Sequence, residues 1–246
     1  MAANSENTGL RNSSKSSQFN ARSSESGVKE KNQTFGGRIM SADDSIPRLV
    51  LIAGATGAGK TTLAKEVAHE LNFARIASTD TIREVMRATV ERIDPALQRS
   101  SYGRGQVGDP ATDWEDSAQA VQVGIEAVVD RARQQGVDLI LEGVHLLPSR
   151  QLLSAWEAAG GAALGIVVKI EDETTHRERI EEREANTWRG PQRYRIGFDR
   201  IRAIQRAIEQ RGAGAEWKVI DTRLHLDGLQ RIRRYLDAAW NEANRR

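Results

Sequence analysis

The sequence predicts a three-layer α/β sandwich, in which helices cover both faces of a parallel sheet. Two observations lead to this fold class. Short apolar runs without polar alternation recur along the chain, as expected of strands that are buried on both faces. Stretches with apolar residues at helical spacing separate these runs. Because strands that alternate with helices form parallel sheets through right-handed crossovers, the pattern predicts one such sheet.

Five strands are predicted, over residues 49–53, 73–77, 139–141, 165–170 and 217–220. The first is followed by a Gly-rich turn and a helix whose apolar face carries Ala64, Val67, Ala68 and Leu71. A helical stretch starts at Thr81, and the third strand is preceded by a long amphipathic helix with Val121, Ile125 and Val128. The chain closes with a helix whose apolar face carries Leu229, Ile232, Leu236 and Trp240.

Composition limits the classes of protein that fit. The 246 residues are 39% hydrophobic, which is enough for one substantial core. A net charge of +2 does not by itself indicate a nucleic-acid partner. The absence of cysteine excludes disulfides, thiol nucleophiles and thiolate metal sites. No apolar stretch approaches the roughly 20 residues that cross a bilayer, so we expect a cytoplasmic protein without a membrane partner.

The chain divides into a tail and a domain. Residues 1–46 are rich in Ser, Asn, Lys, Arg and Gly and carry apolar residues without a period. Such a segment buries too little apolar area to offset the entropy of ordering it, so we expect a disordered tail. It is either a regulatory or docking tail or a dispensable extension, and translation starts at Met1 or at Met40. We expect residues 47–246 to form a single domain.

A phosphate-binding loop follows the first predicted strand. The motif G-x-x-x-x-G-K-[ST] is matched in full by Gly54-Ala55-Thr56-Gly57-Ala58-Gly59-Lys60-Thr61. The glycines let successive backbone N–H groups point at phosphate oxygens, and the positive end of the next helix faces the same point. Lys60 would reach the β- and γ-phosphates, and Thr61 would bind Mg²⁺. The sequence therefore predicts an ATP site with Mg²⁺ at residues 54–61 and Thr62; the alternative is a Gly-rich turn with an exposed lysine.

Charged residues follow the second predicted strand. Asp80 stands at its carboxyl end, where ligands gather in open α/β sheets, so it is a candidate to accept the acceptor's proton or to hold Mg²⁺ through water. The alternative is a helix N-cap. Arg83 and Arg87 are four residues apart, so they share one helix face and would clamp a phosphate or carboxylate of the acceptor. The alternative for this pair is a solvated face beside Glu84 and Glu91.

Four segments resemble 2-phosphoglycerate kinases. They are Ile76 to Arg87, Ser100-Ser101-Tyr102, Leu141 to Pro148 and Phe198 to Gln205. The resemblance covers most of residues 47–222. It implies transfer of the ATP γ-phosphate to the free hydroxyl of 2-phosphoglycerate, and a P-loop fold like that of nucleoside monophosphate kinases with the first strand central. It also places Tyr102 with Asp80, Arg83 and Arg87 at the substrate. Members of this family often carry a further N-terminal region, where this chain has a polar tail.

Two further positions complete the predicted site. Glu142 ends the third strand, where an acidic residue would organise Mg²⁺ through water or orient the acceptor; the alternative is a simple hydrogen-bond acceptor. His145 is expected to be structural. Residues 176–197 are rich in arginine and form a predicted lid, in which Arg183 and Arg189 would stabilise charge on the transferring group. Most of the other lid arginines alternate with glutamate and are expected on the solvated surface.

The sequence thus predicts an ATP- and Mg²⁺-dependent small-molecule kinase for a phosphorylated acid. A kinase for another acid, a sugar or a nucleoside is the main alternative. A GTPase-like switch would need N-K-x-D and D-x-x-G segments, and neither occurs in the sequence. A nucleic-acid-binding protein would use the basic tail and the lid arginines on a phosphate backbone, and we expect no such partner.

Overall fold

The computed structural model describes residues 34–35, 38–39, 46–89, 94–185, 187–188, 190–225 and 227–246. The chain forms two units, Met1–Met40 and Ser41–Arg246. In the first unit, the described residues form β1 (Thr34–Phe35) and β2 (Arg38–Ile39), which pair antiparallel. The predicted disordered tail, residues 1–46, lies almost wholly outside the described residues.

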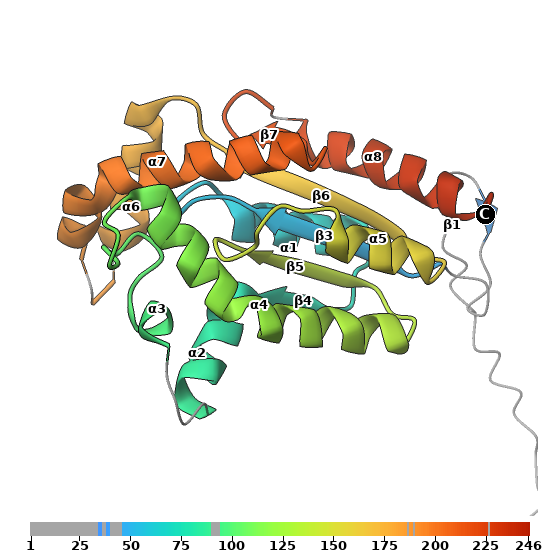
Figure 1. The fold of residues 1–246 in the computed structure, drawn as a ribbon. Coiled ribbons are helices and arrows are strands. Elements are labelled where there is room, and N and C mark those ends of the chain that lie inside the picture. Colours follow the sequence, from blue (N-terminus) through green and yellow to red (C-terminus); the bar gives the residue numbers. More distant parts are fainter. Residues whose placement is uncertain are drawn as a thin grey trace, which may run out of the picture. The chain divides into compact units, whose positions relative to one another are not determined.

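The second unit is built on a five-stranded sheet in which every pairing is parallel. Its order is β4 (Ile76–Ser78), β5 (Leu139–Gly143), β3 (Arg48–Ala53), β6 (Ala162–Lys169) and β7 (Lys218–Asp221). Figure 1 shows β3 in the middle of the sheet. This arrangement confirms the predicted α/β class and the central position of the first sheet strand.

The second predicted strand begins later than expected. Phe73 lies in the turn after α1, where its N–H donates to the Ala68 carbonyl and the Arg48 guanidinium stacks 4.3 Å from its ring centroid. The buried ring therefore covers a helix end, and β4 starts only at Ile76. The apolar side chain of Phe73 indicates that this residue is buried. It does not indicate whether the residue lies in a strand or in a buried turn.

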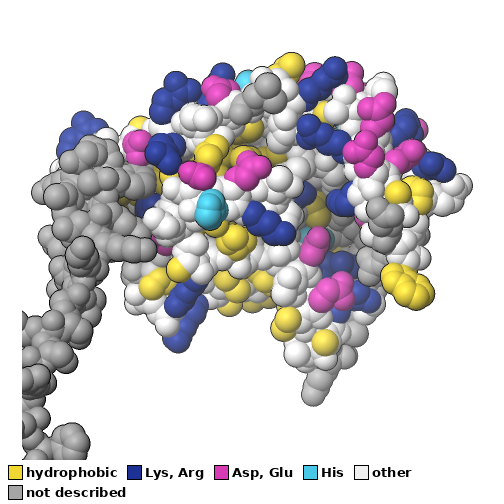
Figure 2. All heavy atoms as spheres, turned by 180° about the vertical axis from the view of Figure 1, so that it is seen from behind, with side chains coloured by type: hydrophobic (Ala, Val, Ile, Leu, Met, Phe, Trp, Pro, Cys, Tyr) yellow, Lys and Arg dark blue, Asp and Glu magenta, His cyan; other side chains and the backbone are white. Residues whose placement is uncertain are grey.

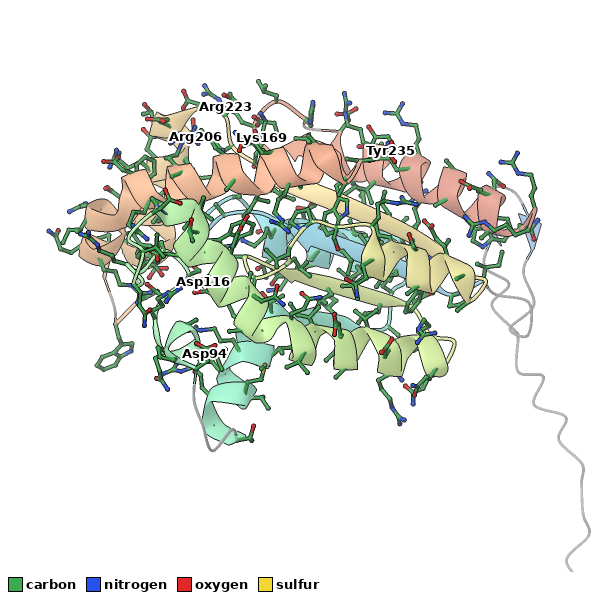
Figure 3. The ribbon with its side chains drawn as sticks, in the orientation of Figure 1. Asp94, Asp116, Lys169, Arg206, Arg223 and Tyr235 are labelled. Atoms are coloured by element: carbon green, nitrogen blue, oxygen red, sulfur yellow. The ribbon has the colours of Figure 1, made fainter. Side chains whose placement is uncertain are left out.

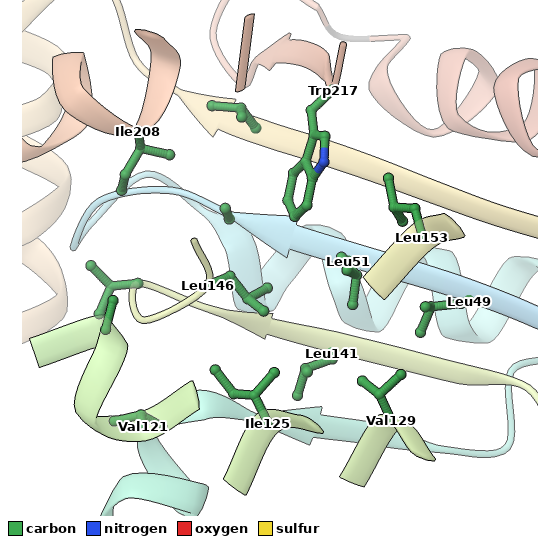
Figure 4. Packing of buried hydrophobic residues seen from close by; sticks show 14 of the residues in the cluster. Leu49, Leu51, Val121, Ile125, Val129, Leu141, Leu146, Leu153, Ile208 and Trp217 are labelled. Atoms are coloured by element: carbon green, nitrogen blue, oxygen red, sulfur yellow. The ribbon is translucent and has the colours of Figure 1, made fainter. Parts of the chain in front are cut away.

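Helices cover both faces of the sheet, as the sequence predicts. On one face lie α1 (Lys60–Glu70) and α8 (Gly228–Ala243); on the other lie α4 (Pro110–Gln134), α5 (Gln151–Ala158) and α7 (Gln192–Gly214). Strand residues alternate between the two faces. Figure 4 shows Leu49, Leu51 and Leu141 packed with Ile125 and Val129 of α4. Burial of these side chains stabilises the domain by about 1.5–3 kcal/mol each.

The remaining helices surround the carboxyl edge of the sheet. They are α2 (Thr79–Thr89), α3 (Pro95–Gln98) and α6 (Glu173–Ala185). The short α3 begins where the Asp94 side chain accepts from the Ala96 N–H ahead of a proline in the first turn (Figure 3). On the face seen in Figure 2, acidic and basic side chains are interspersed. None of the described helices is long and apolar enough to cross a membrane.

Candidate active site

The predicted phosphate-binding loop joins β3 to α1. Gly57 and Gly59 adopt φ values of 83° and 95°, a left-handed backbone that favours glycine, and α1 starts directly afterwards at Lys60. The Lys60 ammonium donates to the Ala55 carbonyl over 2.9 Å. Burial lowers the pKa of Lys60, while the carboxylates of Glu142 and Asp80 oppose that shift. The ammonium is therefore held by a backbone carbonyl of the loop, and the negative charge of both carboxylates acts on it.

The sheet register brings Glu142 to this loop. Glu142 lies opposite Ile52 on one side and Ser78 on the other, so it stands between the strand ends that lead into the loop and into α2. Its Oε1 accepts a hydrogen bond of 2.9 Å from the Thr61 hydroxyl. Glu142 is buried. The predicted strand-end carboxylate and the predicted metal-binding hydroxyl are thus in direct contact.

The start of α2 packs closely on the end of β5. A Cβ on Gly143 would lie 1.7 Å from the Thr79 hydroxyl, so glycine is required for this approach. Thr79 is fully buried, and its hydroxyl lies 3.3 Å from Nδ1 of His145. Asp80 follows in the first helical turn and its side chain is 69% exposed. Its carboxylate therefore reaches into solvent from a fixed backbone.

The alternative role of Asp80 as an N-cap is wrong. The helix already begins at Thr79, and the Asp80 N–H donates to the Ser78 hydroxyl over 3.2 Å. The Asp80 carboxylate lies instead 3.4 Å from Nδ1 of His145. Burial lowers the pKa of His145 to about 4, although Asp80 opposes the shift. Nδ1 is hydrogen-bonded to the Thr79 hydroxyl, so the Asp80 carboxylate lies beside a buried ring that the start of α2 holds in place.

Two cavities meet at the phosphate-binding loop. The first, which we call the loop cavity, has a volume of about 750 Å³ and is lined by Gly57, Gly59, Lys60, Thr61, Thr62, Arg179, Arg183, Thr222 and His225 among others. The second, which we call the α2 cavity, has a volume of about 790 Å³ and is lined by Lys60, Thr61, Asp80, Arg83, Arg87, Tyr102, Glu142, Arg183, Arg193 and Tyr194 among others. Both volumes suit a small ligand. Lys60, Thr61 and Arg183 line both cavities.

The α2 cavity is rich in guanidinium groups, but two of them also support the protein. Arg83 donates to the carbonyls of Leu97 and Arg99 over 3.0 and 2.8 Å, so its helix face is tied to the segment after α3. Arg87 pairs with Glu84 over 2.8 Å on a partly exposed part of the helix, as expected if this face is solvated beside Glu84. The buried Nε atoms of Arg87 and Arg193 have no hydrogen-bond partner among the described residues. Arg87 and Arg193 both line the cavity, so it presents positive charge to an anionic ligand.

The predicted lid lies beside both cavities. Arg183 is on α6, where its Nε donates to Glu184 over 2.9 Å. Its guanidinium lies 5.5 Å from the ring centroid of Tyr194, at the start of α7. Arg195 pairs with Glu181 over 2.8 Å on the surface, as expected for most lid arginines. The other predicted lid residue, Arg189, lies outside the described residues.

Sequence reasoning did not single out three lining residues. Arg179 stands four residues before Arg183 on α6, so helical spacing from that candidate would have found it. Thr222 directly follows β7, and the rule that ligands gather at carboxyl strand ends would have found it. Arg193 lies among many arginines of similar spacing, and no local signal distinguishes it. Only the tertiary structure shows that Arg193 lines the α2 cavity.

The segment that contains these site residues matches a known protein family. A family model described as AAA domain matches residues 49–216, which is more than half of the chain. The matched segment starts in β3 and ends just before β7. It therefore contains the phosphate-binding loop, Glu142 and the lid segment.

Curated relatives match about two thirds of the chain. A 2-phosphoglycerate kinase from Methanothermobacter thermautotrophicus is 34% identical over 178 residues, which cover 66% of this chain and 56% of that protein. Another, from Methanopyrus kandleri, is 37% identical over 168 residues, covering 64% of this chain and 51% of that protein. The chain thus spans about half the length of these relatives. The resemblance predicted from the sequence motifs is confirmed.

Among solved structures, a shikimate kinase from Bacteroides thetaiotaomicron aligns over 78% of this chain and 99% of that chain. The sequence identity is 16% and the TM-score is 0.48.

Proposed function

We propose that this chain, which belongs to the AAA domain family, transfers the γ-phosphate of ATP to the free hydroxyl of 2-phosphoglycerate. The product would be 2,3-bisphosphoglycerate. The observation that carries this proposal is the meeting of two cavities at Lys60, Thr61 and Arg183. A phosphoryl group passing from one ligand to the other would cross that point. The relatives named 2-phosphoglycerate kinase support the choice of acceptor.

ATP would occupy the loop cavity. The backbone N–H groups of residues 54–62 and the start of α1 would bind its phosphates, with Lys60 at the β- and γ-phosphates. Arg183 lies close enough to Lys60 to oppose its protonation electrostatically, so both cations act on the same region. Together they would stabilise the negative charge of the transferring group. The Arg-rich lid, residues 176–197 with Arg189, would exclude water as it closes.

The oxygen donors in the site fit Mg²⁺. Thr61 and Glu142 are in contact, and Asp80 lines the same cavity. Mg²⁺ prefers oxygen ligands and is usually held by one or two carboxylates together with substrate phosphates. No cluster of three or more His, Cys, Asp or Glu side chains suited to a metal occurs in the described part of the chain. Mg²⁺ held by Thr61, and by Glu142 through water, would neutralise charge on the β- and γ-phosphates.

The acceptor would occupy the α2 cavity. The anionic groups of 2-phosphoglycerate, a phosphate and a carboxylate, match the guanidinium groups of Arg83, Arg87 and Arg193. Asp80, exposed at the rim, would accept the proton of the attacking hydroxyl. Tyr102 would bound the cavity on the side of the loop after α3, which limits the length of the acid.

Coupled ADP release tests this function. Purified protein with ATP and Mg²⁺ would be given 2-phosphoglycerate, 3-phosphoglycerate, glycerate, a sugar or a nucleoside. Lys60→Ala should abolish turnover, whereas Lys65→Ala, on the exposed face of the same helix, should retain it. Turnover that is highest with 2-phosphoglycerate and depends on Lys60 supports the proposal. Faster turnover of another acceptor would overturn the substrate assignment. A lack of turnover with every acceptor would overturn the assignment of kinase activity.

A further inference from the structure

The loop between α3 and α4 forms one wall of the α2 cavity. Ser100, Ser101 and Tyr102 line that cavity, and glycines at 103, 105 and 108 follow. Residues 99–109 contain no helix or strand, so their backbone groups need other partners. A glycine-rich segment also loses much conformational entropy when it is ordered. A defined cavity wall therefore requires side chains from elsewhere to hold this loop.

Arg200, on α7, provides most of these contacts. Its Nε donates to the Tyr102 carbonyl over 2.9 Å, and its Nη1 donates to the Gly108 carbonyl over 2.8 Å. Its Nη2 donates to the Gly103 carbonyl over 3.2 Å and to Asp113 over 2.7 Å. One planar guanidinium thus connects both ends of the loop to α7 and α4. A lysine could not reproduce this fixed fork of donors.

Asp113 completes the arrangement from the other side. It is 1% exposed, and a buried carboxylate is costly unless it is paired and hydrogen-bonded. Its Oδ1 accepts from the Gly108 N–H over 3.3 Å, and a Cβ at Gly105 would lie 2.3 Å from the same oxygen. Its backbone carbonyl accepts from Arg99 over 2.6 Å. The glycines therefore let the loop fold closely around the carboxylate.

The side chain of Tyr102 also packs against this face of α7. Gly197 is three residues before Arg200, and a Cβ there would lie 2.7 Å from the Tyr102 ring. The ring centroid of Tyr102 lies 5.3 Å from that of Tyr194, which also contacts the lid arginine Arg183. Thus Arg200 holds the backbone of Tyr102, while Gly197 leaves room for its ring. The loop wall and the lid meet at Tyr194.

We propose that Arg200, paired with Asp113, is a positioning residue that holds residues 100–108 as the wall of the acceptor cavity and thereby sets the affinity for the acceptor. This inference rests on the proposed function, because it takes the α2 cavity as the acceptor site. Arg200 does not line either cavity, so it acts through the loop rather than on the substrate. Within the described part of the chain, Arg200 forms no hydrogen bond with the phosphate-binding loop.

The chain offers a matched control. Arg211 lies on the same helix, α7, and pairs with Glu115 of α4 over 2.8 Å, so it joins the same two helices. That pair is exposed and does not contact the loop. Arg200→Lys keeps the charge but loses most of the fork. We expect it to raise KM for 2-phosphoglycerate about tenfold or more, because the loop loses charge-assisted hydrogen bonds that hold it in place.

In the same variant KM for ATP should stay within about twofold, and Arg211→Gln should leave both KM values unchanged. Amide hydrogen exchange provides a readout that does not need turnover: peptides covering residues 100–108 should exchange about tenfold faster in Arg200→Lys and at the wild-type rate in Arg211→Gln. If Arg200→Lys does not fold, Gly197→Ala tests the same wall, because its Cβ displaces the Tyr102 ring. It should also raise KM for the acceptor alone.

The outcomes separate this inference from the proposed function. If the wild type turns over 2-phosphoglycerate and Arg200→Lys matches it in KM and exchange, the positioning role is overturned and the kinase stands. If KM for ATP rises as much as KM for the acceptor, the role is also overturned, because a general packing defect explains the result. If the wild type does not turn over 2-phosphoglycerate, the proposed function falls, and unchanged exchange at residues 100–108 would overturn the positioning role separately.

Discussion

The Thr61 hydroxyl donates to Oε1 of Glu142 over 2.9 Å, a bond that joins the first turn of α1 to the end of β5. The sheet register places the backbone of Glu142 beside the phosphate-binding loop, and the side chain is buried there. We expect Glu142→Gln to lower kcat about 10- to 100-fold, as the loss of a group that orients a metal usually does. The Mg²⁺ concentration needed for half-maximal rate should rise as well. Steady-state rates over a Mg²⁺ titration measure both effects.

Glu157→Gln is a suitable control for that substitution. Glu157 lies on α5 and pairs with Arg150, whose side chain is exposed, so the same change is made away from the cavities. Its kcat and Mg²⁺ dependence should match the wild type. Wild-type kcat and Mg²⁺ dependence in Glu142→Gln itself would show that the contact with Thr61 has no part in the reaction.

Gly165 lies under the indole of Trp217. A Cβ on Gly165 would lie 2.4 Å from ring atom Cδ2, and the ring is held in place by a bond of 3.0 Å from Nε1 to the Ser149 carbonyl. We expect Gly165→Ala to lower the free energy of unfolding by about 1–3 kcal/mol, because overpacking forces either the strand or the ring to move. Urea denaturation measures the change.

The control for Gly165 is Gly214→Ala. Gly214 is the last residue of α7, and a Cβ there would meet no atom within 4 Å. The free energy of unfolding of this variant should differ from that of the wild type by less than about 0.5 kcal/mol, as is usual for surface substitutions. Equal stabilities for the two variants would mean that the indole moves aside without cost.

The fold was predictable because its buried strands are continuous runs of apolar residues in the sequence. Leu49 to Ala53 form a continuous apolar run because β3 is central and buried on both faces. Strand boundaries were less predictable, since Phe73 and Trp217 are apolar but pack in turns beside the sheet. Local sequence indicates that such residues are buried, and only long-range contacts decide where.

The candidate site was predictable wherever a residue follows a strand. The phosphate-binding loop, Asp80 and Glu142 all stand at carboxyl strand ends, and the parallel sheet brings them together. Arg200 could not be assigned in the same way. It lies in the middle of a long helix, and its partners are backbone carbonyls about a hundred residues earlier in the chain. No spacing rule connects a side chain to such acceptors.

Asp221 ends β7 and accepts three backbone hydrogen bonds, from Glu171, Arg223 and Leu224, at 3.0, 2.8 and 3.2 Å. Burial raises its pKa, but these N–H donors and the nearby Lys169 outweigh burial and lower it below the ordinary value; Figure 3 labels Lys169 and Arg223. A lowered pKa means that Asp221 stabilises the fold above pH about 4, and that this contribution is lost as pH falls through the folded-state pKa.

We therefore expect Asp221→Asn to lower the free energy of unfolding by about 2 kcal/mol at pH 7, the scale of hydrogen bonds to a charged group. The difference from the wild type should shrink below pH about 4, where the wild-type carboxyl also becomes neutral. Urea denaturation at several pH values measures this. Asp130→Asn, which removes an exposed pair with Arg133, should change stability by less than about 1 kcal/mol at any pH. A difference at Asp221 that is constant from pH 7 to pH 3 would contradict the assignment.

His176 joins the lid helix to the phosphate-binding loop in a form that requires a neutral ring. Its Nε2 donates to the Thr56 carbonyl over 2.7 Å, so Nδ1, which lies 3.3 Å from the Arg202 guanidinium, accepts in the neutral tautomer. Protonation of Nδ1 would make it a donor that faces the N–H donor of the Arg202 guanidinium. Burial, opposed by the bond to Thr56, lowers the pKa of His176 to about 4; the pKa of His145 falls equally far.

We expect both imidazoles to remain neutral from pH 8 to pH 5, and NMR titration of the ring signals, assigned with His145→Gln and His176→Gln, measures this. Because the folded-state pKa values lie below the ordinary 6.5, the two neutral rings stabilise the fold above pH 6.5. That stability is lost as pH falls from 6.5 toward about 4, since the unfolded chain takes up protons first. Ring signals that titrate near pH 6.5 in the folded protein would mean that the links from His176 to Thr56 and Arg202 tolerate a charged ring.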